Sequence, residues 1–104
     1  MPDNQFSRDS SDQLCFEIWK VPSLDYPALC RAVATALSLT PLDETIVIGL
    51  DVILQDFQWD EQLVELAWDN WFGFIVTAKT SLSESLVHEI GKWLLQSEWI
   101  GVGG

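Results

Sequence analysis

The spacing of hydrophobic residues predicts a strand and then a helix in the first third of the chain. Residues 14–21 alternate with the period of two that is typical of a β-strand. One face of that strand carries Leu14, Phe16 and Ile18, and the other carries Cys15, Glu17, Trp19 and Val21. Pro22 ends the strand. Asp25 can then cap a helix with Pro27 in its first turn, and apolar residues recur at helical spacing as far as Leu37.

Residues 45–55 (TIVIGLDVILQ) admit two interpretations. The β-branched run from Thr45 to Ile48 favours a buried strand. The apolar residues of the segment also fit helical spacing, and residues 40–43 are typical of a helix start. We favour a turn followed by a strand, in which Gly49 marks a bulge or a close approach between backbones.

Residues 60–71 (DEQLVELAWDNW) are predicted to form an amphipathic helix. Its apolar stripe contains Leu63, Val64, Ala67, Trp68 and Trp71, and its acidic stripe contains Glu61, Glu65 and Asp69. The acids lie four residues apart, so their mutual repulsion opposes the helix. A hairpin around Asp69 and Asn70 is the alternative.

The remaining pattern completes an alternating order of elements. Residues 72–78 (FGFIVTA) are continuously apolar, as in a central strand. A capping box at residues 81–84 then predicts a final helix, whose inward positions are Leu82, Leu86, Ile90, Trp93, Leu94 and Ser97. The order βαβαβα predicts an α/β fold, with a roughly three-stranded sheet and three helices. An α+β sandwich with an antiparallel sheet is expected instead if residues 45–55 are helical or residues 60–68 are extended.

Domain boundaries follow from composition. Residues 1–13 are polar and are expected to form a flexible arm, residues 14–99 a single domain, and residues 100–104 a flexible tail. The start of the chain lacks the apolar segment of a signal peptide, and no apolar run is long enough to span a bilayer. Cys15 and Cys30 form neither a metal motif nor a disulfide framework. We therefore expect a cytoplasmic protein.

The charge of the chain restricts its possible functions more than any other feature. The chain carries 16 acids against 5 bases, a net charge of −11, which disfavours contact with nucleic acid or an anionic membrane. No Lys, Arg or His lies between Arg31 and Lys79. That stretch holds three of the six tryptophans, a residue type favoured at protein interfaces. The predicted partner-binding residues are Trp59, Asp60, Glu61, Glu65, Trp68, Asp69 and Trp71.

These residues predict a non-catalytic protein–protein interaction module. Its partner would present a basic surface, as for an inhibitor, an immunity-like protein or a regulator. Self-association as a homodimer is the other expected use of the exposed tryptophans. No cofactor is predicted. No catalytic residue is assigned either: His88 lies one turn after Glu84 on a predicted helix, and we interpret them as a surface pair rather than as activators of a cysteine.

Two further functions remain as alternatives. Asp56, Asp60, Glu61 and Glu65 offer oxygen ligands suited to Mg²⁺ or Ca²⁺, which would indicate a divalent-metal-binding or hydrolytic domain. The chain ends in Val102-Gly103-Gly104, which resembles the ending of ubiquitin-like proteins and sulfur carriers. That resemblance implies a carrier that works through Gly104.

Overall fold

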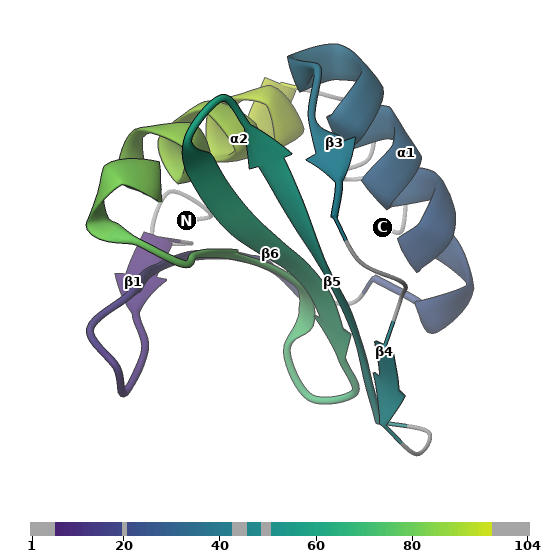
Figure 1. Ribbon diagram of the computed structural model, residues 1–104. Helices are drawn as coiled ribbons and strands as arrows, with labels where there is room; N and C mark the ends of the chain where they lie inside the picture. Colours follow the sequence, from purple (N-terminus) through teal and green to yellow (C-terminus); the bar gives the residue numbers. More distant parts are fainter. Residues whose placement is uncertain (1–5, 20, 43–45, 49–50, 97–104) are drawn as a thin grey trace.

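Seven strands and two α-helices make up the described part of the chain in a computed structural model (Figure 1). The structure describes residues 6–19, 21–42, 46–48 and 51–96. The strands are β1 (Phe6–Arg8), β2 (Leu14–Ile18), β3 (Thr40–Pro41), β4 (Ile46–Ile48), β5 (Val52–Trp59), β6 (Gln62–Asp69) and β7 (Gly73–Ala78). The helices are α1 (Tyr26–Leu37) and α2 (Glu84–Gln96).

The strands form one antiparallel sheet. Its order is β1-β2-β7-β6-β5-β3, and β4 pairs with β5 on the same edge as β3. The predicted α/β fold, with a three-stranded sheet and three helices, is therefore wrong, and the described chain has an α+β fold. An α+β sandwich with an antiparallel sheet is the arrangement expected if residues 60–68 are extended. Residues 62–68 are indeed extended, as part of β6.

The predicted helix at residues 60–71 is replaced by the second strand of a hairpin. β5 and β6 pair along their whole length, and Asp60 and Glu61 form the turn between them. Asp60 has a φ of 55°, the left-handed conformation that tight hairpin turns require. Val64, Leu66 and Trp68 alternate into the core. Helical spacing fitted the segment because apolar residues also occur on the opposite face of β6, which conceals a period of two.

Other elements agree with the sequence pattern to different degrees. The predicted strand at residues 14–21, helix from Asp25 to Leu37 and strand at 72–78 are confirmed as β2, α1 and β7. Residues 45–55 contain β4 and the start of β5 instead of one strand, and Gly49 lies outside the described residues. Residues 6–8, within the predicted arm, form β1.

The final helix is confirmed, but the capping box before it does not form. Residues Ser81–Ser83 make a 3₁₀ turn without a side-chain cap, and Leu82 is 56% exposed instead of facing inward. Ser83 is fully buried, and its hydroxyl oxygen accepts the backbone N–H of Leu63 at 2.7 Å. This bond ties the start of α2 to β6.

Both helices pack on the same face of the sheet (Figure 1). Phe16, Val76 and Leu66 form a row across β2, β7 and β6 and are 0% exposed. The Tyr26 hydroxyl of α1 donates a hydrogen bond to the Leu66 carbonyl at 2.5 Å, which holds α1 over β6. Among the described residues, no helix lies on the other face of the sheet, and no helix is long and apolar enough to cross a membrane.

Candidate functional site

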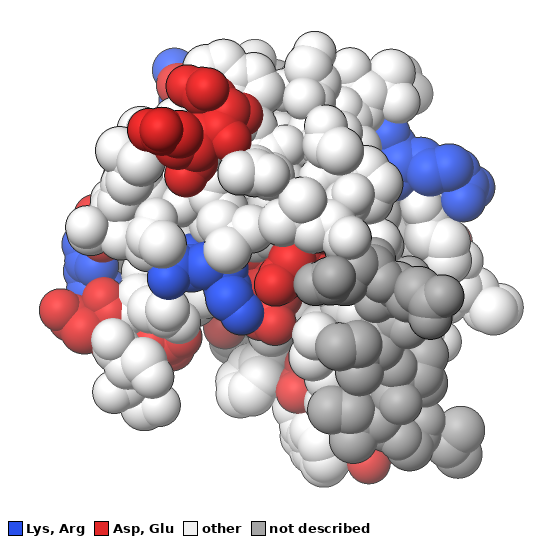
Figure 2. Space-filling view, in the orientation of Figure 1, with Lys and Arg blue, Asp and Glu red and all other residues white. Residues whose placement is uncertain are grey.

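The predicted partner-binding residues do not share one surface. Asp60 and Glu61 lie in the turn before β6, whereas Asp69 and Trp71 lie at its far end. Eight residues span roughly 23 Å in a strand but only about 11 Å in a helix. Figure 2 accordingly shows acidic side chains in separate groups instead of one stripe.

The three tryptophans of this set differ in exposure. Trp59 and Trp71 are 44% and 71% exposed, at opposite ends of the hairpin. Trp68 is only 8% exposed, and its indole N–H donates to the Val21 carbonyl at 2.6 Å. Trp68 is therefore a core residue, and its side chain exposes little surface to a partner.

The predicted metal ligands come together only in part. Asp56 and Glu65 face each other across β5 and β6, while Asp60 and Glu61 lie in the hairpin turn. Lys79 Nζ lies 3.7 Å from Asp56 Oδ1 and 4.0 Å from Glu65 Oε2. Within the described ranges, no three His, Cys, Asp or Glu residues are arranged to hold a metal ion.

A hollow on the helix-free face of the sheet brings together a different set of acids. It has a volume of about 330 Å³ and is built from β2, β5, β6, β7 and the turns beside them. We call it the acidic groove, and its lining residues are Asp9, Cys15, Glu17, Val52, Leu54, Glu65, Ala67, Trp68, Asp69, Phe72, Ile75 and Thr77. Four of these residues are acids and none is a base.

The position of Glu65 makes the groove electrostatically unbalanced. Burial raises the pKa of the Glu65 carboxyl, with smaller contributions from Asp56 and Asp9, and Lys79 opposes the change. Asp56 Oδ1, next to it, is buried and has no hydrogen-bond partner among the described residues. A positive group entering the groove would therefore stabilise carboxylates that the protein itself neutralises incompletely.

Aromatic side chains lie at one end of the groove. Phe72 is 48% exposed and lines it. Trp19 is 66% exposed, and its indole N–H donates to Glu17 Oε1 at 3.4 Å. Asp69 Oδ1 accepts the backbone N–H groups of Trp71 and Phe72 at 2.7 and 3.3 Å, which fixes the turn that carries Phe72. Apolar and acidic contacts are thus available side by side.

No cysteine–histidine pair forms among the described residues. The Cys15 thiol lies at the groove, 3.5 Å from Thr77 Oγ1, and burial raises its pKa. His88 is exposed on α2, on the other side of the sheet. Its ring centroid lies 4.8 Å from that of Phe6, with the two rings tilted. Cys15 is therefore a protonated, poorly nucleophilic thiol at neutral pH, and His88 is not placed to activate it.

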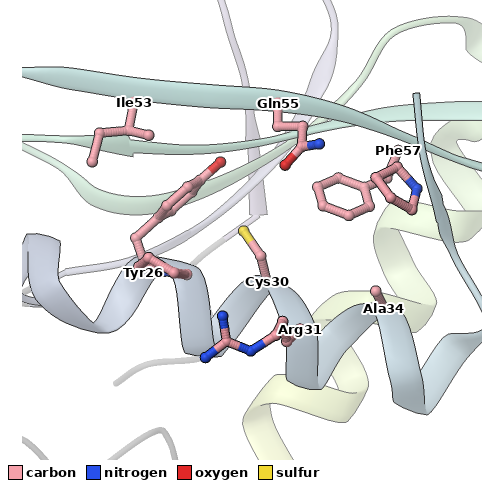
Figure 3. Close-up of a pocket in the computed structure, with 9 residues that line it drawn as sticks. Tyr26, Cys30, Arg31, Ala34, Ile53, Gln55 and Phe57 are labelled. Carbon is pink, nitrogen blue, oxygen red and sulfur yellow. The ribbon is translucent and has the colours of Figure 1, made fainter. Parts of the chain in front are cut away.

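A second cavity, of about 440 Å³, lies between α1 and the edge of the sheet (Figure 3). Tyr26, Cys30 and Ala34 line it from α1, and Ile53, Gln55 and Phe57 line it from β5. It opens on the helix-bearing face and is therefore separate from the acidic groove.

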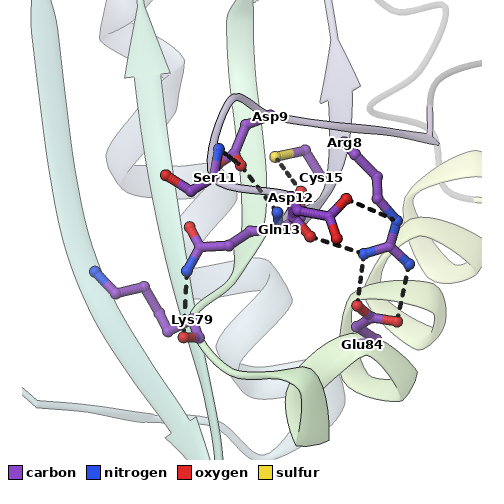
Figure 4. A network of polar contacts seen from close by, with 8 residues as sticks. All are labelled: Arg8, Asp9, Ser11, Asp12, Gln13, Cys15, Lys79 and Glu84. Carbon is purple, nitrogen blue, oxygen red and sulfur yellow. Dashed lines mark hydrogen bonds and ion pairs between the residues drawn. The ribbon is translucent and has the colours of Figure 1, made fainter.

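The hairpin that supplies Asp9 to the groove is fastened to α2 (Figure 4). Asp9 Oδ1 accepts the backbone N–H groups of Ser11 and Gln13, both at 2.9 Å. Arg8 donates to both carboxylate oxygens of Glu84, at 2.7 and 3.1 Å. The two-point contact orients the hairpin against the start of α2.

The contact between Arg8 and Glu84 is expected to make the stability of the protein depend on pH. The hydrogen bonds from Arg8 lower the pKa of Glu84 below its ordinary value of 4.5. A carboxyl with a lowered folded-state pKa stabilises the fold above its unfolded pKa, and the effect is lost as the pH falls through the folded pKa. We expect Glu84→Gln to destabilise the protein at neutral pH, with a difference that shrinks below pH 4.5 in urea unfolding.

Glu89→Gln is the matched control on α2. Glu89 reaches Lys92 at a single distance of 3.7 Å, and both side chains are more than half exposed. Its substitution should change the free energy of unfolding less at every pH. An equal loss for Glu84→Gln at neutral and acidic pH would contradict the assigned role of the Arg8 contact.

Sequence reasoning missed Asp9, Glu17 and Phe72 as members of a site, and Trp19 beside them. The alternation of residues 14–21 had already grouped Cys15, Glu17 and Trp19 on one face. Residues 62–69 also have a second apolar face, and reading them as a strand would have placed Glu65 on that face of the same sheet. Gly103 and Gly104, on which the carrier hypothesis depends, lie outside the described residues.

Comparison of the chain with protein-family models, with curated proteins and with solved structures finds no match.

Proposed function

We propose that this chain is a non-catalytic interaction domain that binds a basic protein surface at the acidic groove. The observation that carries the proposal is the groove's lining, which combines four acids and no base with apolar residues from several strands. An inhibitor, an immunity-like protein or a regulator of a basic protein would use such a surface.

Charge favours a basic partner over a second copy of the chain at this face. The chain has a net charge of −11, so two copies approaching through their grooves would repel each other. A positively charged partner would be steered toward the groove, and its Lys or Arg side chains could pair with Glu17, Glu65 and Asp69.

The apolar part of the groove supports a protein partner over a free cation. Leu54, Ala67 and Ile75 lie on β5, β6 and β7, on the face that carries no described helix. Trp19 and Phe72 add exposed aromatic area at one end. Interfaces gain affinity from buried aromatic anchors, while charged residues at their rim govern association rate and partner choice.

A defined peptide tests the proposal. The probe is a fluorescein-labelled octapeptide of alternating Arg and Val, which presents positive charge and apolar side chains together; the same peptide with Glu in place of Arg is the control. We expect saturable binding of the Arg peptide by fluorescence anisotropy, weakened by salt. The Glu peptide should not bind.

Two matched double variants locate the binding surface. Glu17→Gln with Glu65→Gln removes two groove charges and should raise the Kd of the Arg peptide about three- to tenfold. Asp60→Asn with Glu61→Gln removes two charges from the hairpin turn and should leave the Kd nearly unchanged. Thermal unfolding of each variant checks its folding.

The opposite ranking would place binding at the hairpin turn instead of the groove. Binding that does not respond to salt or to either double variant would contradict a charge-directed interface. No saturable binding of the Arg peptide would count against the proposed function itself.

A further inference from the structure

The cavity between α1 and the edge of the sheet has a largely apolar interior. It holds about 440 Å³, and cavities of this volume are typical of sites for small molecules. Ile53 and Phe57 line it from β5, Pro41 lines it from β3, and Ala34 lines it from α1. Burial raises the pKa of the Cys30 thiol, which also lines the cavity, to about 11, so this thiol is neutral at physiological pH. The interior therefore favours the apolar part of a ligand.

The rim of the cavity carries a positive charge in a strongly acidic protein. Arg31 on α1 is the one base among the described lining residues, which include no acid, whereas the whole chain has a net charge of −11. Arg31 is exposed, and in Figure 3 its guanidinium lies across the α1 ribbon from the side chains of β5. Burial raises the pKa of Cys30, and the Arg31 charge partly opposes that change, so the charge acts on the interior.

Arg31 is not neutralised by an acid of the described chain. Among the described bases, Arg8, Lys79 and Lys92 each have a side-chain nitrogen within 4.0 Å of a carboxylate oxygen. Arg31 forms no such ion pair with a described residue. A base without an acidic partner, at the rim of an apolar cavity, is available to the anionic group of a ligand.

A ligand with an anionic head and an apolar chain would fit this gradient from rim to interior. Its carboxylate would keep much of its hydration beside Arg31, because the guanidinium is exposed, and the cost of burying a charge would be avoided. Its chain would leave water on entering the space between Ile53, Phe57 and Ala34. Arg31 would repel a cationic head, and it would bind a neutral hydroxyl less strongly than a carboxylate.

We propose that this cavity binds a monocarboxylate with an apolar hydrocarbon chain, whose carboxylate pairs with Arg31 and whose chain fills the interior. The charge at the rim and the apolar lining together give this ligand class. The cavity opens on the helix-bearing face of the sheet and the acidic groove lies on the other face, so failure of either proposal leaves the other standing.

Three probes with the same alkyl chain test the ligand class. Octanoate is anionic, 1-octanol is neutral and octylammonium is cationic at neutral pH. Each is titrated into ¹⁵N-labelled protein, and ¹H–¹⁵N spectra are recorded. We expect octanoate to cause saturable shifts of α1 residues around Ala34, with a Kd of about 0.1–1 mM for a molecule of this size. 1-Octanol should bind more weakly, and octylammonium should bind most weakly at these residues.

Two pairs of matched variants locate the contacts. Arg31→Gln should raise the Kd of octanoate about three- to fivefold and leave that of 1-octanol unchanged. Lys92→Gln removes the same charge from α2, outside the lining, and should change neither. Ala34→Leu fills the space and should abolish the octanoate shifts, whereas Ala36→Leu, outside the lining, should retain them. Thermal unfolding of each variant checks its folding.

Several results would overturn the proposal. Binding of 1-octanol or octylammonium at the same residues as tightly as octanoate would reject a carboxylate ligand. The absence of saturable octanoate shifts around Ala34, or shifts that survive Ala34→Leu, would reject the cavity as the site. An octanoate Kd that is equal in Arg31→Gln and Lys92→Gln would reject the contact with Arg31.

Discussion

Replacing Trp68 with alanine is expected to destabilise the protein by about 3–5 kcal/mol. Trp68 is 8% exposed and belongs to the core, between Ile53 and Phe74 on the neighbouring strands. The substitution removes a large buried ring and also leaves the Val21 carbonyl without its indole donor. Urea unfolding followed by far-ultraviolet circular dichroism measures the change without relying on tryptophan fluorescence.

Trp71→Ala is the matched control for this prediction. Trp71 lies three residues away and is 71% exposed, so its removal should change the free energy of unfolding by no more than about 0.5 kcal/mol. Trp68→Phe separates the two causes, because it keeps most of the apolar ring but loses the hydrogen bond. Equal effects of Trp68→Ala and Trp71→Ala would contradict the assignment of Trp68 to the core.

Gly73→Ala is expected to destabilise the protein by about 3 kcal/mol, from backbone strain and overlap together. Gly73 has a φ of 82°, which alanine adopts only with strain. A Cβ atom there would also overlap the Ile18 carbonyl oxygen and lie 3.1 Å from Trp19 Cα. Both obstacles are backbone atoms of the paired strand, so a side-chain rotation cannot relieve them. Thermal unfolding measures the loss.

Gly91→Ala provides the contrast. A Cβ at Gly91 would lie 2.5 Å from Phe6 Cζ and 2.9 Å from Phe16 Cδ1, which are side-chain atoms. The Phe6 ring belongs to the edge strand β1 and can move, and alanine gains about 1 kcal/mol of helix propensity. We therefore expect a smaller loss than for Gly73→Ala. A larger loss at Gly91 would show that β1 holds the Phe6 ring rigidly.

Gly73 also connects stability with the proposed interface. It brings the start of β7 against Trp19 and directly follows Phe72, so the two aromatic residues at one end of the acidic groove depend on its conformation. A folded Gly73→Ala protein should consequently bind the Arg peptide more weakly than the wild type. The proposed binding surface thus includes the turn between β6 and β7, two central strands of the sheet.

Only part of the lining of the candidate site follows from the sequence. Acids beside exposed aromatic residues were expected at residues 59–71, and the structure offers that combination at the acidic groove, with Asp9, Glu17 and Phe72 among its members. Glu65, Trp68 and Asp69 belong to both sets. Asp9 and Glu17 are far from Glu65 in sequence, and only the pairing of β2 with β7 and of β7 with β6 brings their strands together.

Residues 60–71 show why local pattern was insufficient. In a strand with one polar face, a period of two excludes a helix. β6 instead carries Leu63 and Ala67 on its helix-free face as well as Val64, Leu66 and Trp68 in the core, so both periods fit. The eight backbone pairs with β5 decide the conformation, and such pairing is a tertiary property.

The sequence by itself determined the strong local elements and the electrostatic character of the protein. β2, α1, β7 and α2 follow from hydrophobic period and from Pro22 and Pro27, and the net charge of −11 follows from composition. The tertiary structure decided the antiparallel sheet order, the burial of Trp68 and the location of the groove. These features depend on which strands exchange backbone hydrogen bonds, and the backbone groups that pair are the same in every residue except proline.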